Sequence, residues 1–263
     1  MIKICTLFSG SSGNSIFIGK NNTKLLIDAG VSAKRIINAL YSIGENPSEL
    51  SAILITHEHN DHIKGAGILS RRFGIPIYAN ENTWQVIEKL IGPVDVCNKK
   101  FFYTEKNFEI GNTNVLPFNI PHDAVDPVGF NIFIKNKKVT TATDIGHINA
   151  KVIKNIEKSD FVLLESNHDV EMLKVGPYPF FLKQRIMGEK GHLSNEMAAK
   201  TVVHLVKKGT TKFLLGHLSH KNNFPELAYQ TVFSELHRNE IKIGRDILLD
   251  IALRNEAGKI IEV

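Results

Sequence analysis

The sequence is poor in cysteine and has no long apolar run. Its two cysteines, Cys5 and Cys97, form neither a disulfide framework nor a CxxC pair. Both lie in or beside apolar runs, so we expect buried thiols in a reducing compartment. No stretch approaches the roughly 20 apolar residues of a membrane span, and the N-terminus lacks the apolar segment of a signal peptide. We therefore expect a cytoplasmic protein with no membrane partner.

The sequence also lacks internal divisions. No linker, low-complexity block, charge run or repeat separates the 263 residues into parts. Hydrophobic residues make up 43% and charged residues 22%, which is typical of a globular protein. Strand-like and helix-like patterns mix along the chain, so we predict an α+β protein with a single domain over residues 1–263. The exception is residues 169–193, where the pattern is irregular.

A cluster of metal-binding residue types follows the apolar strand-like stretch at residues 52–55. The cluster is an H-x-H-x-D-H run that contains His57, His59, Asp61 and His62. Imidazole and carboxylate groups suit Zn, Mn and Fe. Alternation along an extended loop would put His57 and His59 on one side, and Asp61 and His62 would lie at the turn beyond. The alternative, a solvated polar loop, does not explain four such residues directly after a buried strand.

Three further candidates follow other expected strands. His122 comes after an alternating stretch, Asp144 after residues 139–143, and His217 after residues 213–215. Each has an ordinary alternative: a turn residue for His122, a helix N-cap for Asp144 and a core histidine for His217. Together with the first cluster they predict a site for two ions, in which Asp144 could contact both because a carboxylate has two oxygens.

This pattern resembles the metallo-β-lactamase fold superfamily. The resemblance implies a four-layer αββα sandwich with the metals at one edge, and it implies that Asp28, in Leu25–Gly30, supports the ligand loop from behind. A closer similarity, to the YycJ/WalJ group of bacterial 5′-to-3′ exonucleases, covers the whole chain. It rests on Ser9–Ser15 (SGSSGNS), Gly176–Pro179 (GPYP), Leu182–Ile186 (LKQRI), Gly191–Asn195 (GHLSN), and His217–Ser219 (HLS) with Asn222-Asn223.

The resemblance also gives a role to a histidine outside the ligand set. His192 is similar to the non-ligand histidine that tRNase-Z-like relatives use near the scissile phosphate, and it could protonate the leaving oxygen. A helix-capping turn would explain it equally well. Asp61 and His192 are thus the candidate catalytic residues.

Phosphate contacts are expected on either side of this site. Lys183, Arg185 and Lys190 precede His192 and could bind phosphate, although a solvated face is the usual reason for such charges. The Gly/Ser loop, with Ser12 and Asn14, could present N–H groups to phosphate, or could simply be a hairpin turn.

We therefore predict a phosphodiesterase that uses a hydroxide activated by two metals, Zn²⁺ or Mn²⁺ with Fe as a further option, and acts as an exonuclease on DNA. The net charge of +5 weakly favours such an anionic partner. A homodimer is left open. The alternative is a small-molecule hydrolase for a thioester, lactone or cyclic phosphodiester. A flavodiiron-like redox role would need an acid in place of His59 and a flavin domain, and the chain has neither.

Overall fold

The computed structural model describes residues 1–263, and the chain divides into two compact units. Unit 1 comprises residues 1–119, 124–136 and 253–263, and unit 2 comprises residues 120–123 and 137–252. None of the helices is both long and apolar enough to cross a bilayer.

Unit 1 is built on a mixed sheet in the order β14-β1-β2-β3-β4-β5-β6. The pairs from β14 to β3 are antiparallel and those from β3 to β6 are parallel. A separate antiparallel set, β7-β8-β9, belongs to the same unit. The strands are β1 (Lys3–Phe8), β2 (Ser15–Lys20), β3 (Thr23–Ile27), β4 (Ala52–Leu54), β5 (Ile77–Ala79), β6 (Lys99–Phe101), β7 (Phe108–Ile110), β8 (Thr113–Asn119), β9 (Val128–Ile134) and β14 (Ile261–Glu262).

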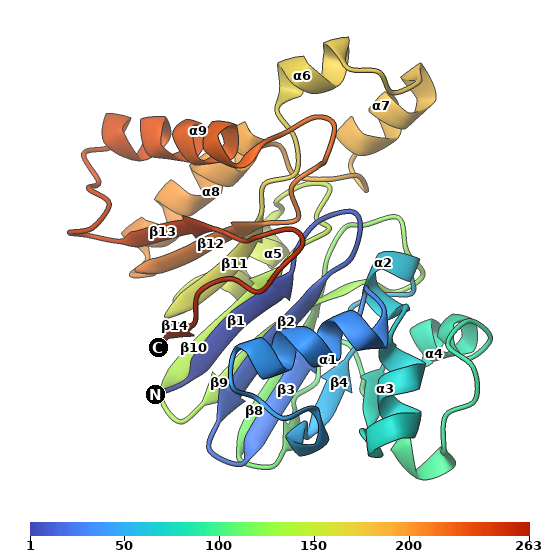
Figure 1. Cartoon of the computed structure of the whole chain (residues 1–263). Coiled ribbons are helices and arrows are strands. Elements are labelled where there is room, and N and C mark those ends of the chain that lie inside the picture. The colour runs from blue at the N-terminus through green and yellow to red at the C-terminus, as the bar shows by residue number, and fades with distance from the viewer. The chain divides into compact units, whose positions relative to one another are not determined.

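Helices cover the mixed sheet of unit 1, as Figure 1 shows for α1 and α3. The apolar side chains Ile36 and Leu40 of α1 and Leu69 of α3 join one buried cluster with Leu26 and Ile53 of the sheet. Their burial is the main stabilising term for this layer. The helices are α1 (Ala33–Ser42), η1 (Pro47–Glu49), α2 (Asn60–Ile63), α3 (Ala66–Phe73), α4 (Glu81–Ile87) and η2 (Val96–Asn98).

Unit 2 contains the parallel strands β10-β11-β12-β13 and five helices (Figure 1). All four strands run in one direction, so their carboxyl ends lie at one edge, where ligands gather in such sheets. The elements are β10 (Lys137–Ala142), α5 (Ala150–Ile156), β11 (Phe161–Glu165), α6 (Val170–Val175), α7 (Phe180–Met187), α8 (Asn195–Lys207), β12 (Lys212–Gly216), α9 (Pro225–Arg238) and β13 (Leu248–Ile251).

Two expectations from the sequence are wrong. Residues 169–193 are not irregular, because they contain α6 and α7. Leu173 is the buried residue of α6 and α7 buries none, so neither helix has the apolar periodicity that reveals a helix in a sequence. Cys5 is buried as expected, but Cys97 is exposed. Cys97 lies in η2, where the neighbouring Val96 is also 87% exposed, so this apolar stretch is a surface turn.

Candidate metal centre

The histidine cluster of unit 1 is a closely packed group of rings in the segment that follows β4. His57 and His62 are fully buried, and their ring centroids lie 4.0 Å apart. The Nε2 atom of His57 lies 3.0 Å from Nδ1 of His59. The extended stretch ends at His59, and Asp61 and His62 lie in the turn beyond it, which is the short helix α2 from Asn60 to Ile63. The helical turn brings Oδ2 of Asp61 within 3.5 Å of Nε2 of His62.

Asp28 holds this cluster from behind, where the resemblance placed it. It follows β3 in the left-handed region, with φ 58°, and is 1% exposed. Its carboxylate accepts hydrogen bonds from the backbone N–H and the hydroxyl of Thr56, both at 2.9 Å, and pairs with Nδ1 of His62 at 2.7 Å. Burial raises the pKa of Asp28, although Thr56 and His62 favour the ionised form. The contact fixes the His62 ring with Nε2 toward Asp61.

The Gly/Ser loop supports the same cluster by close backbone contact. The backbone N–H of Asn14 donates to the carbonyl of Asp61 at 2.8 Å, and its side-chain amide lies 3.1 Å from Nε2 of His62. A Cβ on Gly30 would lie 1.6 Å from that Asp61 carbonyl oxygen. Asn14 is buried and Ser12 is exposed. Asn14 thus has a structural role that does not involve phosphate.

Unit 2 gathers its ligand candidates at the carboxyl edge of its sheet. Asp144 follows β10 and His217 follows β12, both with left-handed φ values, 59° and 54°. Oδ2 of Asp144 lies 3.1 Å from Nδ1 of His217, and Oδ1 lies 3.9 Å from Nε2 of His122. Burial lowers the pKa of His122 and so favours its neutral form, which is the form that binds metals.

Glu165 is a functional candidate that the sequence analysis did not select. It ends β11 and is 0% exposed. Its carboxylate accepts from the backbone N–H groups of Ile145 and Leu193 and pairs with Nδ1 of His192 at 2.8 Å. The signal was present in the sequence, because Glu165 ends an apolar strand just as Asp144 follows the neighbouring one.

The carboxylate of Glu165 therefore holds the ring of His192 in place. Burial alone would lower its pKa, but the charge and hydrogen bond of Glu165, aided by Asp144, raise the pKa of His192 to about 9. Its side chain is 20% exposed. The ring centroids of His122 and His217 lie 5.1 and 5.3 Å away. An imidazole whose pKa is raised by neighbouring carboxylates thus lies beside the unit 2 ligand candidates.

The predicted phosphate contacts are partly engaged within unit 2. The Nζ atom of Lys183 donates to the carbonyl of Lys174 at 2.7 Å, and Arg185 forms an ion pair with Asp123. Lys190 is exposed.

The donor sets fit a divalent ion of the kind predicted. Bonds of about 2.0–2.1 Å in a tetrahedral Zn site place the ligand atoms roughly 3.3 Å apart. The Asp144–His217 and His57–His59 separations, 3.1 and 3.0 Å, are close to this spacing. Polar atoms of Asp144, Glu165, His192 and His217 all lie within 4.8 Å of one another, so the Glu165–His192 pair lies close to two of the ligand candidates.

A family model for the metallo-beta-lactamase superfamily matches residues 9–217. The chain belongs to this superfamily. It is 42% identical over 246 residues to the exodeoxyribonuclease WalJ of Streptococcus pneumoniae, covering 93% of this chain and 91% of that protein. It is 39% identical to the exodeoxyribonuclease YycJ of Bacillus anthracis, covering 90% of each. The crystal structure of the metallo-beta-lactamase fold protein YhfI from Bacillus subtilis superimposes with a TM-score of 0.69 at 16% identity, covering 98% of this chain and 100% of that one.

The predicted superfamily, its fold and the similarity to WalJ and YycJ are thereby confirmed. For a metallo-β-lactamase superfamily member, the His/Asp clusters described above are the expected place for metal. The single domain over residues 1–263 stays a prediction.

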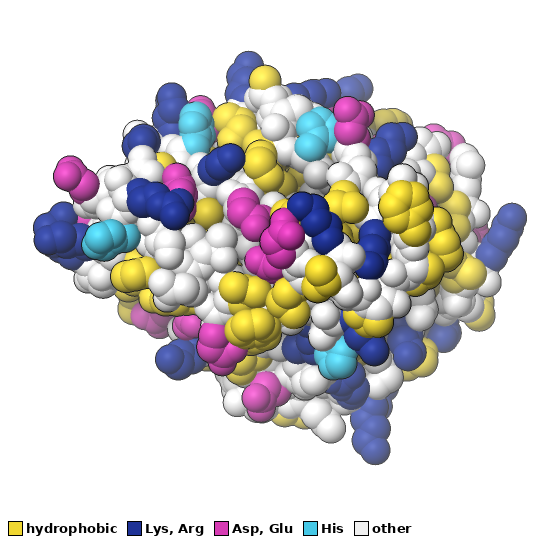
Figure 2. Space-filling model, turned by 90° about the horizontal axis from the view of Figure 1, so that it is seen from above, with side chains coloured by type: hydrophobic (Ala, Val, Ile, Leu, Met, Phe, Trp, Pro, Cys, Tyr) yellow, Lys and Arg dark blue, Asp and Glu magenta, His cyan; other side chains and the backbone are white.

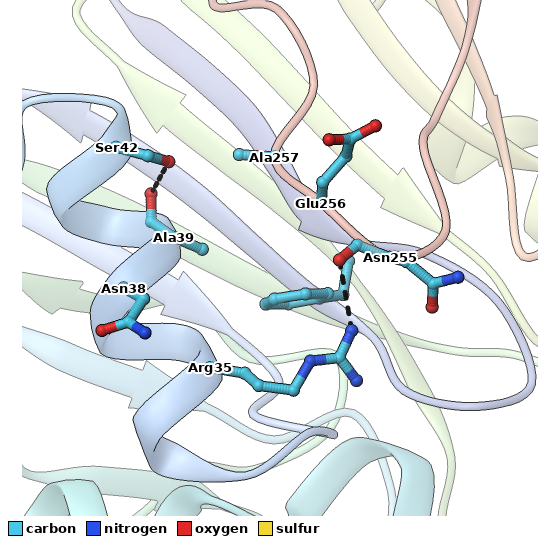
Figure 3. Close-up of a pocket in the computed structure, with 8 residues that line it drawn as sticks. Arg35, Asn38, Ala39, Ser42, Asn255, Glu256 and Ala257 are labelled. Carbon is cyan, nitrogen blue, oxygen red and sulfur yellow. Dashed lines mark hydrogen bonds between the residues drawn. The ribbon is translucent and has the colours of Figure 1, made fainter.

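A hollow of about 280 Å³ in unit 1 differs from the metal-ligand clusters in its lining residues (Figure 3). It lies between α1 and residues 255–257, with the guanidinium of Arg35 4.5 Å from the ring centroid of Phe8 and bonded to the carbonyl of Asn255. Its lining has no histidine and one carboxylate, that of Glu256, so it has no metal-ligand set.

Proposed function

We propose that the protein is a metal-dependent exodeoxyribonuclease that degrades DNA from the 5′ end. The observation that carries the proposal is the unit 2 cluster, in which His192, held by the Glu165 carboxylate, lies beside the ligand candidates Asp144 and His217. An acid beside metal ligands suits the cleavage of a bond whose leaving oxygen needs a proton. The names of the relatives, exodeoxyribonucleases at 39–42% identity over about nine-tenths of the chain, give the substrate.

The proposed metal site takes all seven predicted ligands and two divalent ions, Zn²⁺ or Mn²⁺. The predicted ligands are His57, His59, Asp61, His62, His122, Asp144 and His217. Two such ions, when bound, supply an activated water and neutralise charge on the phosphate. Elemental analysis of protein purified without chelator should give close to two equivalents, and a value that stays at one or below after reloading contradicts the dinuclear site.

Residues of the chain would then protonate the leaving group. Glu165 accepts from Nδ1 of His192, so the opposite nitrogen, Nε2, remains for the substrate. The carboxylates beside His192 raise its pKa, which favours the protonated ring, and the proton can pass from Nε2 to the departing 3′ oxygen. Glu165 fixes the ring, as a carboxylate does for a catalytic histidine.

The test compares two kinds of phosphodiester. Purified protein with Mn²⁺ or Zn²⁺ is given DNA labelled at the 5′ or the 3′ end, RNA of the same sequence, and a nitrophenyl phosphodiester whose leaving group needs little protonation. We expect mononucleotides from the 5′ end of DNA and no activity after chelation. Turnover of ester, thioester or lactone substrates without cleavage of DNA would favour the small-molecule alternative.

His192→Ala tests the proton donor. We expect DNA turnover to fall by about 10²–10⁴-fold with metal content unchanged, and a smaller loss on the nitrophenyl substrate. His204→Ala is a matched control, because His204 pairs with Glu157 at 2.7 Å on the surface of unit 2. It should leave both rates unchanged. Loss of metal from His192→Ala, or equal losses on both substrates, would mean that His192 has another role.

A further inference from the structure

The α6–α7 hairpin of unit 2 exposes large apolar side chains that its fold does not need. Phe180 and Phe181 open α7 and are 73% and 71% exposed, and Val175 at the end of α6 is 85% exposed. α7 has no buried residue. An exposed patch of this kind marks an interaction surface when it recurs over neighbouring residues, as it does here.

Basic side chains outnumber acidic ones on the same hairpin. α7 contains Lys183 and Arg185 and no acidic residue, and Lys174 and Lys190 flank it beside Glu171 and Glu189. Lys174 pairs with Glu171 and Arg185 pairs with Asp123, and both pairs lie on the surface. On the face shown in Figure 2, on the side where α6 and α7 lie in Figure 1, hydrophobic side chains lie among Lys and Arg side chains. Aromatic rings among cations suit nucleic acid, whereas the centre of a protein–protein interface is depleted in lysine.

The hairpin is tied directly to the proposed proton donor. The backbone N–H of His192 donates to the carbonyl of Ile186 in the last turn of α7 at 2.9 Å. A Cβ on Gly191 would lie 2.1 Å from that carbonyl oxygen, so the segment between helix and histidine is closely packed. With a rise of about 1.5 Å per residue, Phe180 lies roughly 9 Å along the helix from Ile186. Rings at that distance are placed for bases one or a few nucleotides away from the bond that is cut.

We infer that the α6–α7 hairpin is a platform for single-stranded DNA, on which bases stack against Phe180 and Phe181 while the flanking basic side chains contact the backbone. This inference rests on the proposed function and adds the form of the substrate to it. Stacking needs unpaired bases, so the platform favours a single strand over a duplex. It also explains why helices with almost no buried face stand beside the site.

Binding to a phosphorothioate oligonucleotide, which resists cleavage, tests the platform in the metal-loaded protein. The double variant Phe180→Ala/Phe181→Ala should weaken the Kd for a single strand about tenfold or more, as expected for one or two lost stacks. Phe180→Tyr/Phe181→Tyr should bind like the wild type, because it keeps both rings. Tyr103→Ala is the matched control in unit 1: Tyr103 is 69% exposed with Lys106 over its ring, and its loss should leave Kd unchanged.

Turnover separates this inference from the proposed function. The double alanine variant should raise KM for single-stranded DNA and leave the rate on the nitrophenyl phosphodiester unchanged. If the wild type cleaves DNA and the variant binds and cleaves it equally well, the platform is wrong and the nuclease stands. If the wild type cleaves neither DNA nor the small diester, the proposed function is wrong, and the binding measurement alone decides whether the platform exists. If light scattering shows a wild-type dimer that the variant loses, with DNA binding unchanged, the patch joins two copies and the inference is overturned.

Discussion

Replacing Asp28 with asparagine isolates what its charge does for the metal-binding loop. Asparagine has the same shape and tolerates the left-handed φ of 58° at this position, so the backbone need not change. Oδ1 can still accept from the backbone N–H of Thr56. The second oxygen, which meets the Thr56 hydroxyl and His62, becomes an NH₂ group.

That amide inverts the hydrogen bond to His62. An amide N–H donates to Nδ1, so the neutral ring must carry its proton on Nε2, the atom that faces Asp61. A protonated nitrogen cannot bind a metal. Losing a hydrogen bond to a charged group costs about 1.5–3 kcal/mol, and losing a carboxylate that orients a metal ligand typically costs 10–100-fold in metal affinity.

Metal competition against a chromophoric chelator measures the affinity, and urea unfolding of the metal-free protein measures the stability. We expect Asp28→Asn to lower Zn²⁺ affinity by about 10–100-fold. Asp160→Asn is the control: Asp160 accepts from Lys137 and Lys138 in unit 2, and its change should leave the affinity as it is. A Zn²⁺ affinity of Asp28→Asn within twofold of wild type would refute the reasoning.

Three further substitutions test predictions about activity, stability and pH dependence. Asp61→Ala should abolish hydrolysis while circular dichroism stays unchanged, because the side chain is 25% exposed and the carbonyl that Asn14 uses remains; an unfolded variant contradicts this. Gly30→Ala should cost 2 kcal/mol or more in urea unfolding, since its Cβ meets the Asp61 carbonyl, and should cost more than Gly44→Ala, where nothing lies within 4 Å. Burial lowers the pKa of His168 to about 4, so between pH 6.5 and 4 the unfolded chain binds the extra proton and acid removes stability, by about 2 kcal/mol from pH 7 to 5. His168→Gln should reduce that loss, and an unchanged pH profile would show that His168 does not cause it.

The ligand candidates could be predicted because they depend on local pattern. His57 to His62 are contiguous, His217 comes directly after the apolar strand β12, and Asp144 follows β10, whose Val and Thr residues suit a strand. Strand ends are also where unit 1 and unit 2 place non-glycine residues with left-handed φ, at Asp28, Asp144 and His217. Such positions cost about 1–3 kcal/mol each and concentrate at functional sites.

Other features depend on contacts that no short pattern records. Helix α7 has no buried face, so its sequence carried no periodic signal, and Cys97 lies in an apolar stretch that the fold leaves on the surface. Glu165 does end an apolar strand, but its contact with His192, 27 residues further along the chain, is what no short pattern shows.

The two carboxylate–histidine pairs show how one contact can serve two purposes. Asp28 meets Nδ1 of His62, 34 residues away, and Glu165 meets Nδ1 of His192, at 2.7 and 2.8 Å. Each pair directs Nε2 toward its task. His62 is fully buried and burial raises the pKa of its Asp28, so burial disfavours two charges in this pair, and in the proposed site Nε2 faces the metal. His192 is partly exposed, and the charges of Glu165 and Asp144 raise its pKa, which suits the proposed role of Nε2 as a proton donor. In the proposed site, the degree of burial therefore separates the ligand from the acid.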